Sequence, residues 1–188
     1  MELQTQRTIL RELQAADLHD IHDLHSFPEV DRYNTLGIPA AIEHTQSLLS
    51  EWLASQVSTP RKSYIFTVRT TDADEFVGLI ALNIGKPNYR IAEVWYKMHP
   101  SHWRRGYASE ALAQLLKFGF ETLNMHRIEA GCAVDNKASI RVLEKAGMTR
   151  EGRKRAILPI RGEWVDNFFY SILEDEFTAS APGQSSQP

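Results

Sequence analysis

The alternation of apolar and polar residues separates strand-like runs from helix-like runs along the chain. Apolar residues at every second position predict strands, whereas apolar residues three and four positions apart predict helices with one buried face. The predicted strands are 7–13, 63–69, 76–84, 91–98, 126–134, 148–154 and 164–173. The predicted helices begin after Asp17, begin at Pro39, span 110–123, and run from Lys137 to Gly147.

The order of these elements defines the fold class. One strand, two helices, three strands, a helix, a strand, a helix and two strands predict an α/β (α+β) protein with a mixed sheet. We expect one domain over residues 1–177, because a chain of 188 residues can bury a single substantial core. Residues 178–188 are rich in Ser, Pro, Gly and Gln and predict a disordered tail.

Composition narrows the function classes. Hydrophobic residues make up 43% and charged residues 24%, which is typical of a globular protein in water. The net charge of −3 argues against general nucleic-acid binding, because neutralising phosphates requires an excess of basic residues. No apolar run approaches the roughly 18 residues of a membrane span, so no membrane partner is expected. The single cysteine, Cys132, excludes an internal disulfide and favours the cytoplasm.

The strongest chemical signal is the segment HPSHWRRGYASEA at 99–111, which joins a predicted strand to a predicted helix. The first N–H groups of a helix have no partner inside the helix and attract anions. Gly106 permits close approach of a phosphate, and the small residues Ala108 and Ser109 leave room for it. Arg104 and Arg105 add two positive charges. The segment therefore predicts a site for a cofactor that carries a pyrophosphate.

This segment resembles the acetyl-CoA pyrophosphate loop of the GNAT N-acetyltransferases, [QR]-x-x-G-x-[GA], with Gly106 and Ala108 at its Gly and Ala positions. Trp103 stands at its first position, which is similar to the branch of the ribosomal-protein N-acetyltransferases RimJ and RimL. Further blocks that resemble this branch lie at 123–130, 135–148 and 161–173. Together the blocks cover roughly half of the chain in the right order, which makes a chance match improbable.

The resemblance implies the GNAT fold, a mostly antiparallel sheet of about seven strands in which strands 91–98 and 126–134 splay apart to admit acetyl-CoA. It implies an acetyl-CoA-dependent N-acetyltransferase with acetyl-CoA as co-substrate. The backbone N–H of Met98 or His99 is expected to stabilise the oxyanion. The residues expected to bind the cofactor are Met98, His99, Trp103, Arg104, Arg105, Gly106, Tyr107, Ala108, Ser109, Asn136, Ser139 and Lys145.

Three residues are candidate catalytic groups. Acetyl transfer to an amine requires a neutral amine, a stabilised oxyanion and protonation of the departing thiolate. Glu93 lies on the strand that leads into the loop and is the candidate base; the alternatives are an exposed strand residue or a structural partner for Arg90. Ser139 is the candidate for thiolate protonation, because the Tyr that serves many GNAT enzymes is replaced here by Leu143. Asn136 lies three residues before Ser139 and can face the thioester or cap the helix.

The expected acceptor is the α-amine of a protein or peptide N-terminus. An α-amine titrates near ~8 and a lysine near ~10.4, so the α-amine requires a weaker base. Trp95 stands where the branch usually has a small residue and can narrow the acceptor groove. A small-molecule amine, an antibiotic or a polyamine, is therefore one alternative acceptor, and a non-catalytic acyl-CoA-binding regulatory module is the alternative class. The sequence does not fix the oligomeric state and leaves a homodimer open.

Two further clusters, one of histidines and one of basic residues, do not predict a functional site. His19, His22 and His25 follow one another at three-residue spacing, but their side chains turn about 120° around a helix, so no metal site is predicted. A basic cluster near the C-terminal hairpin is interpreted as a solvated turn, with a surface for an acidic partner, or for RNA near a ribosome, as the alternative. This cluster comprises Arg150, Arg153, Lys154, Arg155 and Arg161.

Overall fold

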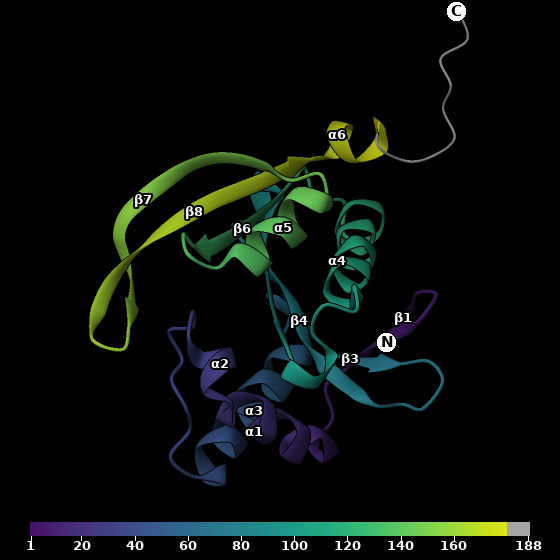
Figure 1. Cartoon of the computed structure of the whole chain (residues 1–188). Coiled ribbons are helices and arrows are strands. Elements are labelled where there is room, and N and C mark those ends of the chain that lie inside the picture. Colours follow the sequence, from purple (N-terminus) through teal and green to yellow (C-terminus); the bar gives the residue numbers. More distant parts are fainter. Residues whose placement is uncertain (180–188) are drawn as a thin grey trace, which may run out of the picture.

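A computed structural model describes residues 1–179 as one mixed sheet with helices on both faces (Figure 1). The strands are β1 (Glu2–Gln4), β2 (Thr8–Glu12), β3 (Ser63–Thr70), β4 (Phe76–Ile84), β5 (Ile91–Met98), β6 (Arg127–Ala133), β7 (Thr149–Ile160) and β8 (Glu163–Leu173). Their order in the sheet is β1-β2-β3-β4-β5-β6-β8-β7. Only β5 and β6 pair in parallel, so the predicted mixed, mostly antiparallel sheet is confirmed.

The helices form two layers. The helices are α1 (Leu18–Ser26), α2 (Pro28–Asp31), α3 (Ile42–Gln56), α4 (Tyr107–Lys117, continued by a π-helical turn, Phe118–Thr122), α5 (Lys137–Lys145) and α6 (Glu174–Ala179). Single helical turns of the 3-10 type lie at Ala15–Asp17, Pro87–Tyr89 and Pro100–His102. In Figure 1, α1, α2 and α3 lie on one side of the sheet, and α4 and α5 lie on the other.

The alternation of strand side chains explains why the sheet buries two cores. Successive residues of a strand point to opposite faces. Along β4, Leu79 and Ala81 pack with α1 and α3, whereas Ile80 and Leu82 pack on the other face with the apolar residues of α4. β4 therefore has a nearly continuous apolar sequence, as expected for a strand covered on both faces.

Several predicted boundaries were wrong. β7 continues to Ile160, six residues beyond the predicted end. The prediction ended too early because most side chains of β7 are exposed and show no alternation of apolar and polar residues. α3 begins at Ile42 and not at Pro39. β1 and α2 were missed because each is too short to show a period. α6 extends to Ala179, and the rest of the predicted tail, 180–188, lies outside the described residues.

The two central strands separate along their length, as the family resemblance implied. β5 pairs with β6 only from Ile91 to Val94, opposite Arg127 to Ala130. β5 then continues to Met98 alongside β4. The second half of β5 thus has a neighbour on one edge only, and its other edge is open.

Candidate active site

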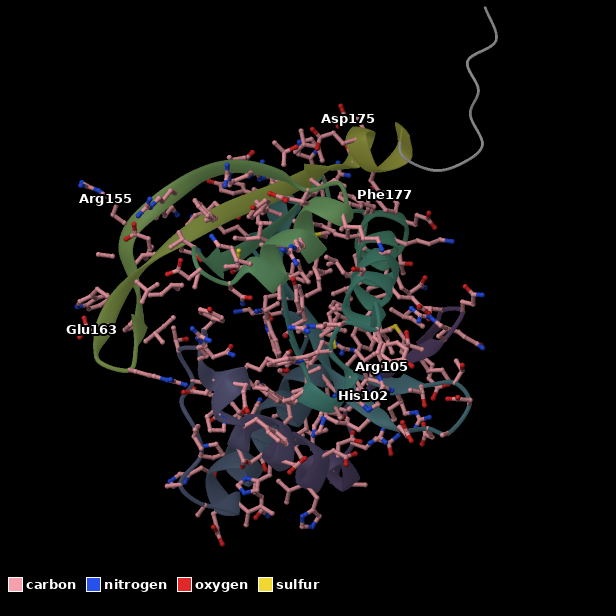
Figure 2. All side chains as sticks on the ribbon, in the orientation of Figure 1. His102, Arg105, Arg155, Glu163, Asp175 and Phe177 are labelled. Atoms are coloured by element: carbon pink, nitrogen blue, oxygen red, sulfur yellow. The ribbon has the colours of Figure 1, made fainter. Side chains whose placement is uncertain are left out.

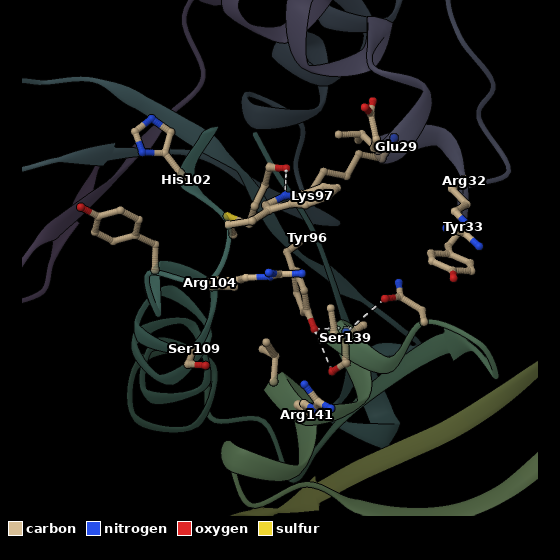
Figure 3. A pocket seen from close by; sticks show the side chains of 18 of the residues that line it. Glu29, Arg32, Tyr33, Tyr96, Lys97, His102, Arg104, Ser109, Ser139 and Arg141 are labelled. Carbon is tan, nitrogen blue, oxygen red and sulfur yellow. Dashed lines mark hydrogen bonds between the residues drawn. The ribbon is translucent and has the colours of Figure 1, made fainter. Parts of the chain in front are cut away.

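A groove of about 660 Å³ lies where β5 and β6 separate. Four segments line it, and Figure 3 shows their side chains converging on one space. These segments are the end of β5 (Tyr96, Lys97, Met98), the loop before α4 with its first turn (His102, Trp103, Arg104, Gly106, Tyr107, Ala108, Ser109), the start of α5 (Asn136, Ala138, Ser139, Arg141, Val142) and α2 with the loop that follows (Glu29, Val30, Arg32, Tyr33, Asn34).

The groove contains most of the residues that were expected to bind the cofactor, but His99, Arg105 and Lys145 do not line it. Lys145 lies exposed at the far end of α5, and Arg141, one turn earlier, lines the groove in its place. Arg105 is exposed, and its carbonyl accepts a hydrogen bond of 3.0 Å from Arg7. Arg141 was not predicted as a site residue, because the segment 135–148 was interpreted from its resemblance to the family alone.

The loop before α4 has the backbone conformation of an anion site. Gly106 is left-handed, with φ +85° and ψ 0°, and caps α4, so that the N–H groups of the first helical turn open onto the groove. Arg104 also has a positive φ, +62°, and its side chain points into the groove (Figure 3). The backbone N–H groups, the helix dipole and this guanidinium fit a pyrophosphate.

Arg7 holds this loop against the start of β2. Its guanidinium lies 5.0 Å from the centre of the Tyr107 ring, and its Nε donates a 2.8 Å hydrogen bond to Glu110 on the first turn of α4. The backbone N–H of Arg7 donates to the same carboxylate at 2.7 Å. Burial raises the pKa of Glu110, but the hydrogen bond from the Thr5 hydroxyl and then those from Arg7 bring it below its usual value. A segment distant in sequence thus fixes the anion site.

The open edge of β5 supplies a backbone donor for an oxyanion. The N–H of His99 donates to the carbonyl of Val77 at 2.8 Å, and Gly85 donates to Ile91 at the other end of β5. In an antiparallel pair, the backbone N–H and C=O groups of alternate residues point to the same neighbouring strand. The backbone groups of the odd-numbered residues of β5 therefore point to β4, and the N–H of Met98 points to the opposite edge. The N–H of His99 is therefore bonded to β4, and of the two predicted oxyanion donors the N–H of Met98 is the one that faces the open edge. The Met98 carbonyl accepts the indole N–H of Trp103 at 2.7 Å.

A pair of hydroxyls lies opposite this donor. Ser139 Oγ is 2.8 Å from the hydroxyl of Tyr96, which projects from β5 (Figure 3). Asn136 Oδ1 accepts the backbone N–H of Ser139 at 3.1 Å, so Asn136 caps α5 and orients its first turn. Loss of hydration raises the pKa of Tyr96 and keeps its hydroxyl protonated. Burial likewise raises the pKa of the neighbouring Cys132 thiol to about 11, against a smaller lowering effect of Ser139.

Glu93 lies outside the groove lining. It faces Asn83 on β4 and Glu129 on β6 in the sheet register. Its side chain reaches solvent, yet partial loss of hydration and then the like charge of Glu129 raise its pKa. The alternative role as a partner of Arg90 was wrong, because that guanidinium binds Asn124 and Glu174.

Next to α2, which lines one end of the groove, two segments distant in sequence are in contact. Arg161 at the tip of the β7–β8 hairpin donates to Asp31 Oδ2 at 3.2 Å and to the carbonyl of Pro28 at 2.9 Å. The hairpin arches away from the sheet before its tip returns toward α2 (Figure 1). Trp95 lies on the α1–α3 face of β5, where its ring centre is 5.9 Å from that of Trp52.

The basic cluster lies along this long hairpin, where its residues are exposed to solvent and Arg161 lies in the turn. Lys154 Nζ lies 3.7 Å from the centre of the Phe169 ring, and Arg153 forms an ion pair with Asp166. Figure 2 shows Arg155 on the outer side of the hairpin, pointing away from the molecule. Most of these cations thus stabilise the hairpin itself.

Two of the three histidines of α1, His22 and His25, have different partners. His22 contacts Thr45 Oγ1 at 2.8 Å, and His25 is buried beside Lys97. Within residues 1–179 no cluster of three or more His, Cys, Asp or Glu side chains is arranged to hold a metal ion. No helix in the same part of the chain combines the length and apolarity of a membrane span.

Comparison with known proteins defines the family. The model of the acetyltransferase (GNAT) domain matches residues 7–149, and the chain therefore belongs to the GNAT acetyltransferases. The uncharacterized N-acetyltransferase YoaA of Bacillus subtilis (strain 168) is 33% identical over 172 residues, which cover 92% of this chain and 96% of YoaA. A GNAT-family acetyltransferase from Bacillus anthracis has a TM-score of 0.81 at 30% identity, covering 93% of this chain and 99% of that one.

Two further structures share the fold and differ in their substrates. Spermidine N-acetyltransferase from Vibrio cholerae, in complex with CoA and spermine, has a TM-score of 0.82 at 23% identity and covers 93% of this chain and 99% of its own. The ribosomal L7/L12 α-N-protein acetyltransferase RimL, in complex with coenzyme A, has a TM-score of 0.84 at 18% identity, with coverages of 94% and 99%. The GNAT resemblance is thus confirmed: the protein is an acetyltransferase with acetyl-CoA as co-substrate.

Proposed function

We propose that this acetyltransferase acts on the α-amine of a protein or peptide N-terminus. The observation that carries the proposal is the charge of the groove. Apart from Arg104, which is assigned to the pyrophosphate, its lining contains three cations, Arg32, Lys97 and Arg141, against one carboxylate, Glu29. A polyamine carries several positive charges and is disfavoured in such surroundings. An α-amine carries at most one charge and loses it at a pH near ~8.

In this proposal acetyl-CoA lies along the open edge of β5. Its pyrophosphate accepts hydrogen bonds from the first N–H groups of α4 beside Gly106 and pairs with Arg104. Its pantetheine arm takes the pairing positions that β6 leaves open beyond Val94. The indole N–H of Trp103 donates to the Met98 carbonyl, so that carbonyl already has a partner. The Met98 N–H remains as the backbone donor near the thioester.

The chemistry then follows from the groups on either side of the thioester carbonyl. The amine nitrogen forms a bond to the carbonyl carbon, and the oxygen becomes an oxyanion that accepts the Met98 N–H. Collapse of this intermediate breaks the carbon–sulfur bond and releases the thiolate of CoA. The Ser139 hydroxyl, hydrogen-bonded to Tyr96, donates a proton to that thiolate and takes up a proton from water in return. The proton of the amine passes to water, with Glu93 as the proposed base through intervening water.

A small-molecule amine is the second candidate acceptor. The packing of Trp95 against Trp52 places bulk on the acceptor face of β5, which favours a compact acceptor. The groove charges weigh against polyamines but not against a small amine with a single charge.

The test is acetyl incorporation into peptides that contain an internal lysine and have either a free or a blocked N-terminus. Release of CoA is followed in parallel with spermidine as the competing class. We expect label only on the peptides with a free N-terminus. Label on the blocked peptides, or CoA release with small amines alone, would overturn the α-amine assignment and leave the acetyltransferase assignment intact.

A further inference from the structure

We propose that Lys97 binds a carboxylate of the acceptor, so that the enzyme selects amines with a carboxylate close by. The inference rests on the proposed function and specifies its substrate class. Two sources supply this chemistry: an acidic side chain next to a peptide N-terminus, and the α-carboxylate of a free amino acid. The experiment below distinguishes them.

The position of Lys97 places its ammonium on the acceptor side. Residues of β5 alternate between the faces of the sheet, and Trp95 packs with α1 and α3 whereas Tyr96 packs with the α4 core. Lys97 therefore shares the face of Trp95, and Met98 shares the face of Tyr96. The ammonium and the proposed oxyanion donor come from consecutive residues, so a group bound by Lys97 lies near the reacting carbonyl.

Lys97 has no carboxylate partner in the described part of the chain. Its only hydrogen bond there is a long contact of 3.5 Å to Nε2 of His25. His25 supplies no negative charge, and burial, followed by the positive charge of Lys97, lowers its pKa to about 3. An unpaired ammonium in a half-buried position is costly, which agrees with a Lys97 pKa that burial lowers to about 8.

The neighbouring acids do not fill this gap. Asp31 favours the charged form of Lys97 through space, but its Oδ2 accepts from Arg161. Glu29 lines the groove and forms no ion pair with Lys97. Figure 3 shows Lys97 extending toward α2, with Arg32 and Tyr33 across the groove. A carboxylate from the acceptor would therefore meet an uncompensated ammonium and the nearby Arg32.

The experiment measures kcat/KM for peptides that share a free N-terminal Ser and carry Glu, Gln or Lys as the second residue, with free glutamic acid and spermidine as further acceptors. We expect the Glu peptide to exceed the Gln peptide by about tenfold or more, since a hydrogen bond to a charged group is worth that much. Lys97→Met should bring this ratio close to one, and Lys97→Arg should preserve it. The surface variant Lys117→Met is the matched control and should leave the ratio unchanged.

The outcomes separate the two proposals. Equal rates for the Glu and Gln peptides with the wild-type protein would overturn the carboxylate role and leave N-terminal acetylation standing, and this comparison requires no variant to fold. If Lys97→Met lowered kcat/KM equally for all peptides and changed the pH profile, the carboxylate role would also be overturned. Lys97 would then act as a proton acceptor. Acetylation of free glutamic acid but of no peptide would overturn the peptide acceptor and support the carboxylate role. Acetylation of spermidine alone would overturn both.

Discussion

At the scale of single residues, the backbone conformation of Gly106 restricts what can replace it. Its φ of +85° is unfavourable for a β-branched residue, and a Cβ would lie 3.2 Å from Arg7 Nη2. In the wild type, acetyl-CoA at ~100 times its Kd should stabilise the fold by about 2.7 kcal/mol. Gly106→Val should abolish this shift in melting temperature. Gly152→Val, where a Cβ meets nothing within 4 Å, should retain it; a shift that survives in Gly106→Val would contradict the anion site.

The hydroxyls of Ser139 and Tyr96 should act as one unit. Ser139→Ala removes the proposed proton donor and should lower kcat by on the order of 10²-fold, with little change in the Kd of acetyl-CoA. Tyr96→Phe should have a smaller effect, and the double variant should lose less than the product of the two, because the groups share a hydrogen bond of 2.8 Å. Single-turnover kinetics measures these effects, and an unchanged rate in Ser139→Ala would reduce that residue to a packing role.

The carboxyl of Glu93 makes stability depend on pH. Its pKa is raised in the folded state by loss of hydration and by Glu129, so its contribution is most favourable at low pH and declines as pH rises through the raised pKa. Glu93→Gln should therefore increase the melting temperature at pH 7.5 and give little or no increase at pH 4. A gain of equal size at both pH values would assign the effect to packing.

The residues that sequence could predict and those it could not differ in how they are distributed. The loop from Trp103 to Ser109 is contiguous, so its chemistry could be interpreted from the sequence alone. Tyr96 and Lys97 lie in a strand whose register decides to which face of the sheet each side chain points. Arg161 reaches Asp31 because the hairpin is long, and its exposed sequence did not indicate that length. Pairings between distant segments leave no local pattern.

At the scale of elements, the close approach of β4 to β5 shapes the active site. A Cβ at Gly78 would lie 2.2 Å from the Lys97 carbonyl oxygen and 2.8 Å from Met98 Cα, both backbone atoms with little freedom to move. Gly78→Ala should therefore cost more than about 2 kcal/mol of stability and displace the end of β5. Gly37→Ala, which has a positive φ but open space around it, is the control for backbone strain. Denaturant unfolding measures both, and equal costs would exclude the steric explanation.

The elements that sequence predicted well are those that bury one regular face. α4 has a clear apolar period because it packs on one core, and β4 has a nearly continuous apolar run because it is covered on both faces. β7 is exposed along most of its length, and α2 is a single turn, so neither has a period to read. α2 lines one end of the groove, and the β7–β8 hairpin reaches α2 through Arg161, so this region was the least predictable.

At the scale of the whole molecule, the contact between Arg161 and Asp31 connects the C-terminal hairpin to the N-terminal helices. Arg161→Ala leaves the Asp31 carboxylate, which is 7% exposed, without its cation, so that it should cost about 1–3 kcal/mol. We expect a raised KM for the acceptor, an unchanged Kd for acetyl-CoA and faster hydrogen exchange at the hairpin tip. Arg155→Ala, on the outer side of the hairpin, should change none of these; an unaltered acceptor KM in Arg161→Ala would separate the hairpin tip from acceptor binding.

The alternation of Lys97 and Met98 across β5 has a consequence for engineering. Consecutive residues of one strand serve the acceptor and the acetyl donor, and the pleat assigns odd-numbered positions to the first and even-numbered positions to the second. New acceptor preferences can thus be selected by randomising positions 95 and 97 as a two-site library, while the backbone that receives acetyl-CoA stays the same. Because the acceptor-side positions can change without changing the backbone that binds acetyl-CoA, one scaffold can yield enzymes with different acceptors.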